Sequence, residues 1–298
     1  MAAAKFKQFL AGHQGRTGCY RVLDGVGSEE TALTPPPAIR LQVHPEALRL
    51  IAYSAFWAMV LFAICMHSLF VRGVDMEDTP LVRLFGYNNI CIYWDYTPSR
   101  ELTAMFYPLV EFPLLAYVVL NWLQVRQSYG QGAAPKWLYR LSSALLPVKL
   151  VLLSWFRMVF VVIAFEDTKG HTLGFQGLQL SLVLVALQDV LFMEALQIAW
   201  PRFGRKLTRV LHWTYFVALT VVTFLKLLIV LTLFYASAPV VDPKTSSGAA
   251  FCQILDRLWM LLAAVLPIAL AELERRSEPG LYFVVTAAGA QHDDPEGK

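Results

Sequence analysis

Long blocks of hydrophobic residues alternate with short polar segments along the whole chain. A helix needs roughly 20 apolar residues to cross the ~30 Å hydrocarbon core of a bilayer, and six blocks reach that length. They cover about Leu50–Val71, Thr103–Val125, Ser142–Phe165, Thr172–Trp200, Val210–Ala236 and Phe251–Ala271. This pattern predicts an all-α polytopic membrane bundle of about six transmembrane helices.

The segments around these blocks divide the chain into one membrane domain and two tails. Residues 1–47 form an N-terminal tail, in which the Thr-Pro-Pro-Pro run at Thr34–Pro37 is typical of an extended linker. Residues 48–272 hold the six predicted helices. Residues 273–298 end in a polar run, and we expect this C-terminal tail to be disordered.

The distribution of positive charge predicts the orientation of the chain. With both tails and the second and fourth loops on one side, that side holds 16 Lys and Arg residues, against five in the three opposite loops. Cytosolic segments are enriched in Lys and Arg, so both termini are expected on the cytosolic, positive-inside face. A basic, acid-free stretch before Asp24 indicates the mitochondrial inner membrane as one alternative location.

Charged side chains inside the predicted spans are the first candidates for a functional site. A charge facing lipid costs several kcal/mol, so each is expected to pair or to line a wet cavity. Depth along the helices, at about 1.5 Å per residue, matches three pairs. They are Glu111 with Arg157 and Lys226 with Asp256 in the outer half, and Lys149 with Glu194 in the inner half.

The outer residues suggest a candidate polar pocket. It would contain His171, which precedes the fourth span, together with the Glu111–Arg157 and Lys226–Asp256 pairs. The alternative interpretation is a set of structural clamps between helices. The fourth span is also the richest in glutamine, so we expect it to face the bundle interior; its glutamines are Gln176, Gln179, Gln188 and Gln197.

Other combinations of reactive residues give weaker indications. Cys91 and Cys252 are both expected on the outer side, where an oxidising compartment would allow a disulfide. His171 with Glu166 and Asp167 is a candidate acid/base cluster. The sequence contains no zinc-ligand spacing and no P-loop, dinucleotide or nucleophile motif. No cofactor or metal is therefore expected, and the small net charge of +3 gives no indication of nucleic-acid binding.

Three short motifs resemble the DRAM/Frag/Sfk family, which includes CWH-type proteins and proteins of GPI-lipid remodelling. The residues are Tyr96-Thr97-Pro98-Ser99 before the second span, Glu166-Asp167 with His171-Thr172-Leu173-Gly174-Phe175 around the start of the fourth, and Ile254-Leu255-Asp256 in the sixth. The resemblance covers roughly residues 48–272. It implies a multi-pass protein of the endomembrane system or the plasma membrane. Its role would be non-catalytic, in membrane trafficking or lipid-anchor handling, with membrane lipids as its partners.

Two other functions remain open at this point. The chain fits an accessory subunit of a larger organellar membrane complex, with other membrane subunits as partners. It also fits a transporter or channel that uses the buried charges, although no inverted repeat is visible. A lipid-handling protein is expected to have a lipid-sized outer cavity near His171, Glu111 and Asp256, which distinguishes it from the other two.

Overall fold

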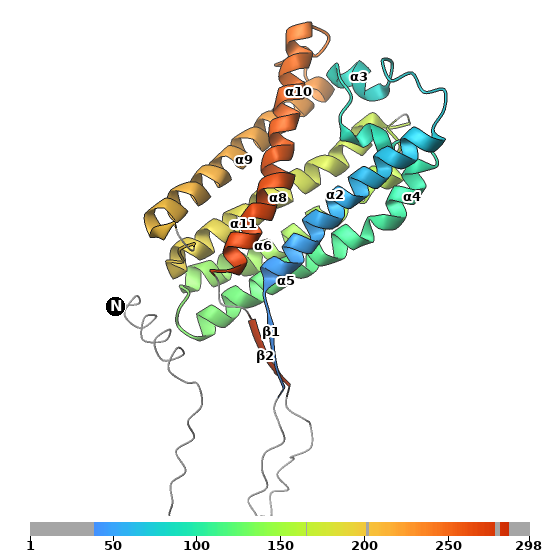
Figure 1. The fold of residues 1–298 in the computed structure, drawn as a ribbon. Helices are drawn as coiled ribbons and strands as arrows, with labels where there is room; N and C mark the ends of the chain where they lie inside the picture. The colour runs from blue at the N-terminus through green and yellow to red at the C-terminus, as the bar shows by residue number, and fades with distance from the viewer. Residues whose placement is uncertain (1–38, 165, 201–202, 278–280, 286–298) are drawn as a thin grey trace, which may run out of the picture.

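The computed structural model describes residues 39–164, 166–200, 203–277 and 281–285, which form a bundle of membrane-crossing helices (Figure 1). Six segments are long and apolar enough to span a bilayer. They are Pro45–Phe70, Ser99–Gly130, Lys136–Val161, Thr168–Leu196, Gly204–Tyr235 and Ser246–Arg275. The prediction of an all-α polytopic bundle with six crossings is confirmed.

Several crossings consist of more than one helical element. The elements are α2 (Pro45–Phe70), α3 (Pro80–Phe85), the 3-10 helix η1 (Ile90–Trp94), α4 (Ser99–Phe106), α5 (Pro108–Gly130), α6 (Lys136–Trp155), α7 (Met158–Val161), α8 (Thr168–Leu196), α9 (Gly204–Tyr235), α10 (Ser246–Met260), the π-helical η2 (Leu261–Val265) and α11 (Leu266–Arg275). The second crossing divides at Pro108 and the sixth just before Pro267, since proline lacks the amide proton that a continuous helix needs.

In the π-helical turn η2, the backbone carbonyl of Ala264 accepts a hydrogen bond from the neighbouring helix α2. A π-turn leaves the regular hydrogen-bond ladder of an α-helix locally offset. The indole Nε1 of Trp57 on α2 donates to the carbonyl oxygen of Ala264 at 2.9 Å. This bond ties the first crossing to the sixth near the middle of the bundle.

The first helix begins before its hydrophobic block, and the last helix ends after its own. α2 starts at Pro45 and α11 ends at Arg275, whereas the corresponding blocks cover only Leu50–Val71 and Phe251–Ala271. Glu46, Arg49 and Glu274 therefore belong to the first and last crossings. Pro45 explains the early start, because its fixed φ suits the first position of a helix.

A two-stranded ribbon joins the segments that flank the bundle. β1 (Ile39–Val43) pairs antiparallel with β2 (Leu281–Val285), so that Ile39 lies opposite Val285 and Val43 opposite Leu281. The composition of the tails predicts irregular structure here, and this prediction is wrong for the two strands. Both segments are rich in β-branched, aromatic and other apolar residues that favour strands. The Thr34–Pro37 linker and the predicted disorder of residues 286–298 lie outside the described residues. The ribbon places the two flanks at one end of the bundle (Figure 1).

Helix α8 forms the centre of the bundle. Of its most apolar stretch, 61% is buried, against 22–39% for the other five crossings. The expected interior position of this helix is confirmed, since Gln176, Gln179 and Gln188 are all buried. Gln197 differs, because it is exposed and ends the helix with a left-handed φ of 57°. Gly174 and Gly177 let α8 approach the third crossing closely.

Candidate functional site

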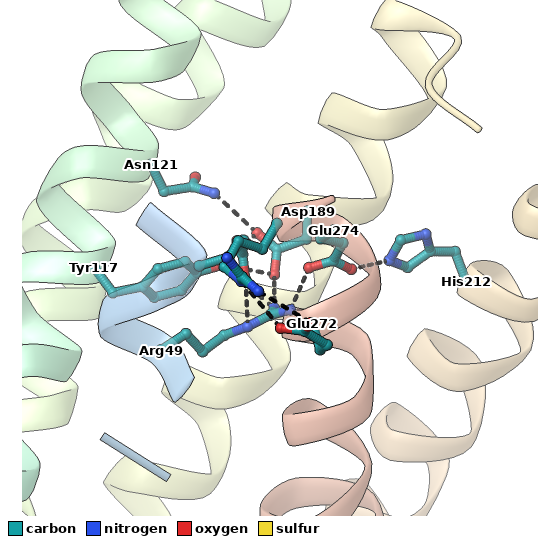
Figure 2. A network of polar contacts seen from close by, with 9 residues as sticks. Arg49, Tyr117, Asn121, Asp189, His212, Glu272 and Glu274 are labelled. Atoms are coloured by element: carbon teal, nitrogen blue, oxygen red, sulfur yellow. Dashed lines mark hydrogen bonds and ion pairs between the residues drawn. The ribbon is translucent and has the colours of Figure 1, made fainter. Parts of the chain in front are cut away.

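A buried arginine gathers three carboxylates near the inner end of the bundle (Figure 2). Arg49 on α2 is only 4% exposed. Its Nε lies 2.7 Å from Glu46 Oε2, and its first terminal nitrogen lies 3.0 Å from Asp189 Oδ2. The second terminal nitrogen donates to Glu274 Oε2. A guanidinium has a fixed fork of donors, which suits it to several carboxylates at once.

Two polar residues of α5 extend this cluster across the bundle. The Tyr117 hydroxyl lies 3.0 Å from both carboxylate oxygens of Asp189, and the Asn121 amide donates to Asp189 Oδ1 at 3.1 Å. Gln188 on α8 donates to the Asn121 oxygen, and Lys149 on α6 donates to the Gln188 oxygen. The chain of hydrogen bonds thus reaches the third crossing.

His212 on α9 completes the set of helices. Its Nε2 lies 2.6 Å from Glu274 Oε1, and its side chain is buried. Every one of the six crossings therefore supplies a side chain to this arrangement, which we call the Arg49 cluster; it comprises Glu46, Arg49, Tyr117, Asn121, Lys149, Gln188, Asp189, His212 and Glu274. Its ionic contacts are made away from water, where electrostatic interactions are stronger.

Sequence reasoning missed the core of the Arg49 cluster. Arg49 and Glu274 lie outside the hydrophobic blocks and read as charges of the solvated tails, and His212 reads as an interface residue. A signal was present, because Pro45 marks a helix start and Glu46 with Arg49 has the i,i+3 spacing of an intrahelical pair. Asp189 lies within a predicted span, but its partner Arg49 lies outside the predicted spans.

Two of the three predicted ion pairs are present. Arg157 Nε lies 2.6 Å from Glu111 Oε1, and Lys226 Nζ pairs with Asp256 Oδ1. Glu111 is 3% exposed while the Arg157 side chain is 54% exposed, so the arginine covers a buried acid from the outside of the bundle. These two predictions of helix-to-helix pairing are confirmed.

The predicted inner-half pair between Lys149 and Glu194 is wrong. Glu194 instead pairs with Arg209 of α9, whose Nε lies 2.9 Å from Glu194 Oε2. Lys149 is 1% exposed and donates to Gln188. Gln188 lies on α8 about 9 Å deeper than Glu194 at the helical rise of 1.5 Å per residue, so Lys149 meets an amide rather than the acid.

His171 lies apart from the two acids that the sequence placed beside it. Glu166 and Asp167 are exposed, and Asp167 caps α8 by accepting the Gly170 amide at 3.0 Å. The ring Nδ1 of buried His171 lies 2.9 Å from the Val162 carbonyl oxygen, which assigns the proton to Nδ1. Its Nε2 then faces Asp95 Oδ1 at 3.6 Å.

Asp95, from the segment after η1, is the acid that accompanies His171. Its side chain is buried, and this burial raises the pKa of Asp95 to about 7, opposed by the charge of Arg100. A carboxyl group with that pKa can exchange a proton near neutrality. The expected cluster of His171 with Glu166 and Asp167 is thus replaced by a His171–Asp95 contact.

The predicted disulfide between Cys91 and Cys252 is absent, because both residues are free, buried thiols. They belong to different hydrophobic clusters. Cys91 packs with α2 and η1 residues and Cys252 with α8 and α9 residues, and the Tyr87 ring touches both clusters. Burial raises the pKa of the Cys91 thiol well above its usual value, which leaves it in its unreactive form.

Within the described part of the chain, no three His, Cys, Asp or Glu side chains converge as a metal site would require. Two small cavities instead lie outward of the Arg49 cluster. One is an apolar cleft of about 50 Å³, lined by residues such as Tyr53, Leu114 and Trp259. The other, also of about 50 Å³, has apolar lining residues together with polar ones such as His171 and Lys226, and we call it the polar cavity. Each is smaller than the lipid-sized cavity expected from the sequence.

Comparison of the chain with protein-family models, with curated proteins and with solved structures gave no match.

Proposed function

We propose that this multi-pass membrane protein has a non-catalytic, lipid-handling role and that its apolar cleft receives the end of a lipid acyl chain. The cleft carries the proposal. It lies among residues from every membrane crossing except the fifth, and its walls are aliphatic and aromatic. Lipid-binding sites need such concave apolar surface with few polar groups.

The position of the cleft supports the same proposal. Ala52 and Tyr53 line it, and they lie one helical turn outward of Arg49 on the same face of α2. The Arg49 cluster therefore closes the bundle on the inner side of the cleft. Because that cluster links all six crossings, it favours a fixed bundle over the relative motion of two halves that transport requires.

The small size of the cleft defines how it would be used. A volume of about 50 Å³ holds only the end of an alkyl chain, so the rest of the lipid would lie between the outer ends of the helices. The resemblance of His171–Phe175 and Ile254–Asp256 to the DRAM/Frag/Sfk family points the same way, towards membrane trafficking or lipid-anchor handling.

The test is purification of the full chain from its own membranes in mild detergent, followed by native mass measurement and lipid identification. We expect a small particle with near-stoichiometric bound lipid. Ala264→Leu extends a side chain into the cleft and should lower the bound lipid at least tenfold. Val265→Leu is the matched control, because Val265 is 41% exposed on the outer face of the same helix.

Two outcomes would contradict the proposal. Recovery of a large assembly with other subunits in fixed ratio would support the accessory-subunit alternative. Equal lipid content in the wild type and in Ala264→Leu would place any bound lipid outside the cleft.

A further inference from the structure

The polar cavity and the apolar cleft share one wall. The cavity lies between α8 and α9 under the η1 segment, and Phe175 of α8 lines both it and the cleft. On the polar side the wall is formed by His171, Gln176 and Gln179 of α8 and by Lys226 of α9. The two spaces are therefore neighbours on either side of Phe175, and polar side chains line only the second of them.

The polar end contains hydrogen-bonding groups that the described residues do not satisfy. Gln179 has no exposed surface, and neither its Oε1 nor its Nε2 has a partner among the residues of the structure. Gln176 Oε1 also has no partner, and His171 Nε2 makes no hydrogen bond, although it lies 3.6 Å from Asp95 Oδ1. An unpaired buried polar group costs about 1–3 kcal/mol, and leucine at these positions would avoid that cost. These side chains are therefore arranged to bind a polar group.

The charges around the cavity are already balanced. Lys226 Nζ is paired with Asp256, and it lies 5.1 Å and 5.8 Å from the ring centres of Trp259 and Phe175. His171 contacts Asp95, which lies outside the cavity lining. Arg100, which lies near Asp95, pairs with Glu101 at 2.6 Å. No cation of the described lining is left to neutralise a phosphate.

The pairing of these charges determines which chemical class of ligand the cavity can bind. A phosphate or carboxylate would enter as a buried negative charge without a counter-charge, which is strongly unfavourable. A hydroxyl group both donates and accepts hydrogen bonds. It can therefore accept from Gln179 Nε2 and donate to Gln179 Oε1 or to His171 Nε2.

We propose that the polar cavity binds the free hydroxyl of an uncharged lipid whose acyl chain enters the apolar cleft on the other side of Phe175. A diacylglycerol has this chemistry. The inference rests on the proposed lipid-handling function and adds the class of headgroup to it. Gln179 is the residue that recognises the hydroxyl, because both of its polar atoms are unpaired.

The experiment compares two photoactivatable lipids with identical acyl chains, a diacylglycerol and the phosphatidic acid that differs from it by one phosphate. Each is offered to the purified full chain in nanodiscs. We expect the diacylglycerol to be captured at least tenfold more strongly. Gln179→Leu should abolish this preference, and Gln127→Leu, a half-buried glutamine of α5 away from both cavities, should leave it intact.

A second measurement separates loss of binding from loss of folding. Because Gln179 has no partner in the described residues, Gln179→Leu should keep or raise the melting temperature. Gln188→Leu on the same helix breaks bonds to Asn121 and Lys149 and should lower it.

The outcomes also separate the two proposals. Equal capture of both lipids by the wild type, or a preference for phosphatidic acid, would overturn the headgroup assignment and leave the acyl-chain cleft standing. Capture of neither lipid would overturn both. A preference that survives Gln179→Leu would mean that the hydroxyl is recognised elsewhere.

Discussion

Arg49 is the cation that neutralises three buried acids. It contacts Glu46, Asp189 and Glu274, all of them buried. Removal of one member of a buried ion pair is costly because it leaves the other charge uncompensated, by roughly 3–5 kcal/mol. Here a single substitution would leave three buried acids without their counter-charge.

We therefore predict that Arg49→Met strongly lowers the melting temperature of the detergent-purified protein. Adding Asp189→Asn and Glu274→Gln to the same chain should restore part of the lost melting temperature, since two of the uncompensated negative charges are then removed. Arg83→Met is the control, because the Arg83–Asp78 pair is exposed and should contribute little. A melting temperature of Arg49→Met equal to that of the wild type would show that the cluster is not a stabilising centre.

Asp95 gives a prediction about pH. Its folded-state pKa is raised to about 7 by burial, so the folded protein binds a proton that the unfolded chain releases at its ordinary, lower pKa. This stabilisation is complete below about pH 4 and disappears as the pH rises to about 7, by roughly 4 kcal/mol in total. Asp95→Asn should be more stable than the wild type at pH 8 and similar to it at pH 4.

Melting curves of both proteins between pH 4 and pH 8 measure this difference. Asp78→Asn is the control in the same loop, because the exposed Asp78 has a pKa that its bond to Arg83 lowers, opposite in direction to the shift of Asp95. If the difference between Asp95→Asn and the wild type does not change with pH, the Asp95 carboxyl titrates in its ordinary range.

At the scale of the helices, hydrophobicity locates each crossing but not its ends. Each of the six blocks overlaps most of one helix, because a long apolar run in lipid can satisfy its backbone only as a helix. The inner ends of the first and last crossings extend past their blocks, because polar residues can continue a helix when they turn into the bundle. Arg49 and Glu274 are charges of that kind. Hydropathy assigns such charges to solvated tails, and only the packing of the helices reveals their partners.

The contact between α8 and the third crossing depends on two glycines. A Cβ atom at Gly174 would lie 3.2 Å from Met158 Cβ and from the backbone nitrogen of Val159. We predict that Gly174→Val pushes the helices apart and destabilises the protein by roughly 1–3 kcal/mol, as overpacking of a tight contact does.

The measurement is again the melting temperature in detergent. Gly130→Val is the matched control, because a Cβ atom at that glycine meets no heavy atom within 4 Å. Equal losses for the two variants would mean that the effect is one of valine in a helix rather than of packing.

At the scale of the whole molecule, the Arg49 cluster forms the inner layer of the bundle, and the apolar cleft lies outward of it. The Glu111–Arg157 and Lys226–Asp256 pairs join helices beside the cleft, which Val110 and Phe156 line. The sequence could predict the outer pairs, because both members lie within hydrophobic blocks at matching depth. It could not predict that Lys149 meets an amide, since helix rotation decides which side chain of α8 faces it.

The ribbon of β1 and β2 also determines how the protein would bear a mechanical load. Ile39 and Val285 form the pair nearest to the two chain ends, so tension on both tails peels the antiparallel pairs apart one after another instead of shearing them together. Once the ribbon has opened, the load passes directly to α2 and α11. The Arg49–Glu274 ion pair joins these two helices beside the ribbon. After the ribbon has opened, the tension therefore acts on this ion pair.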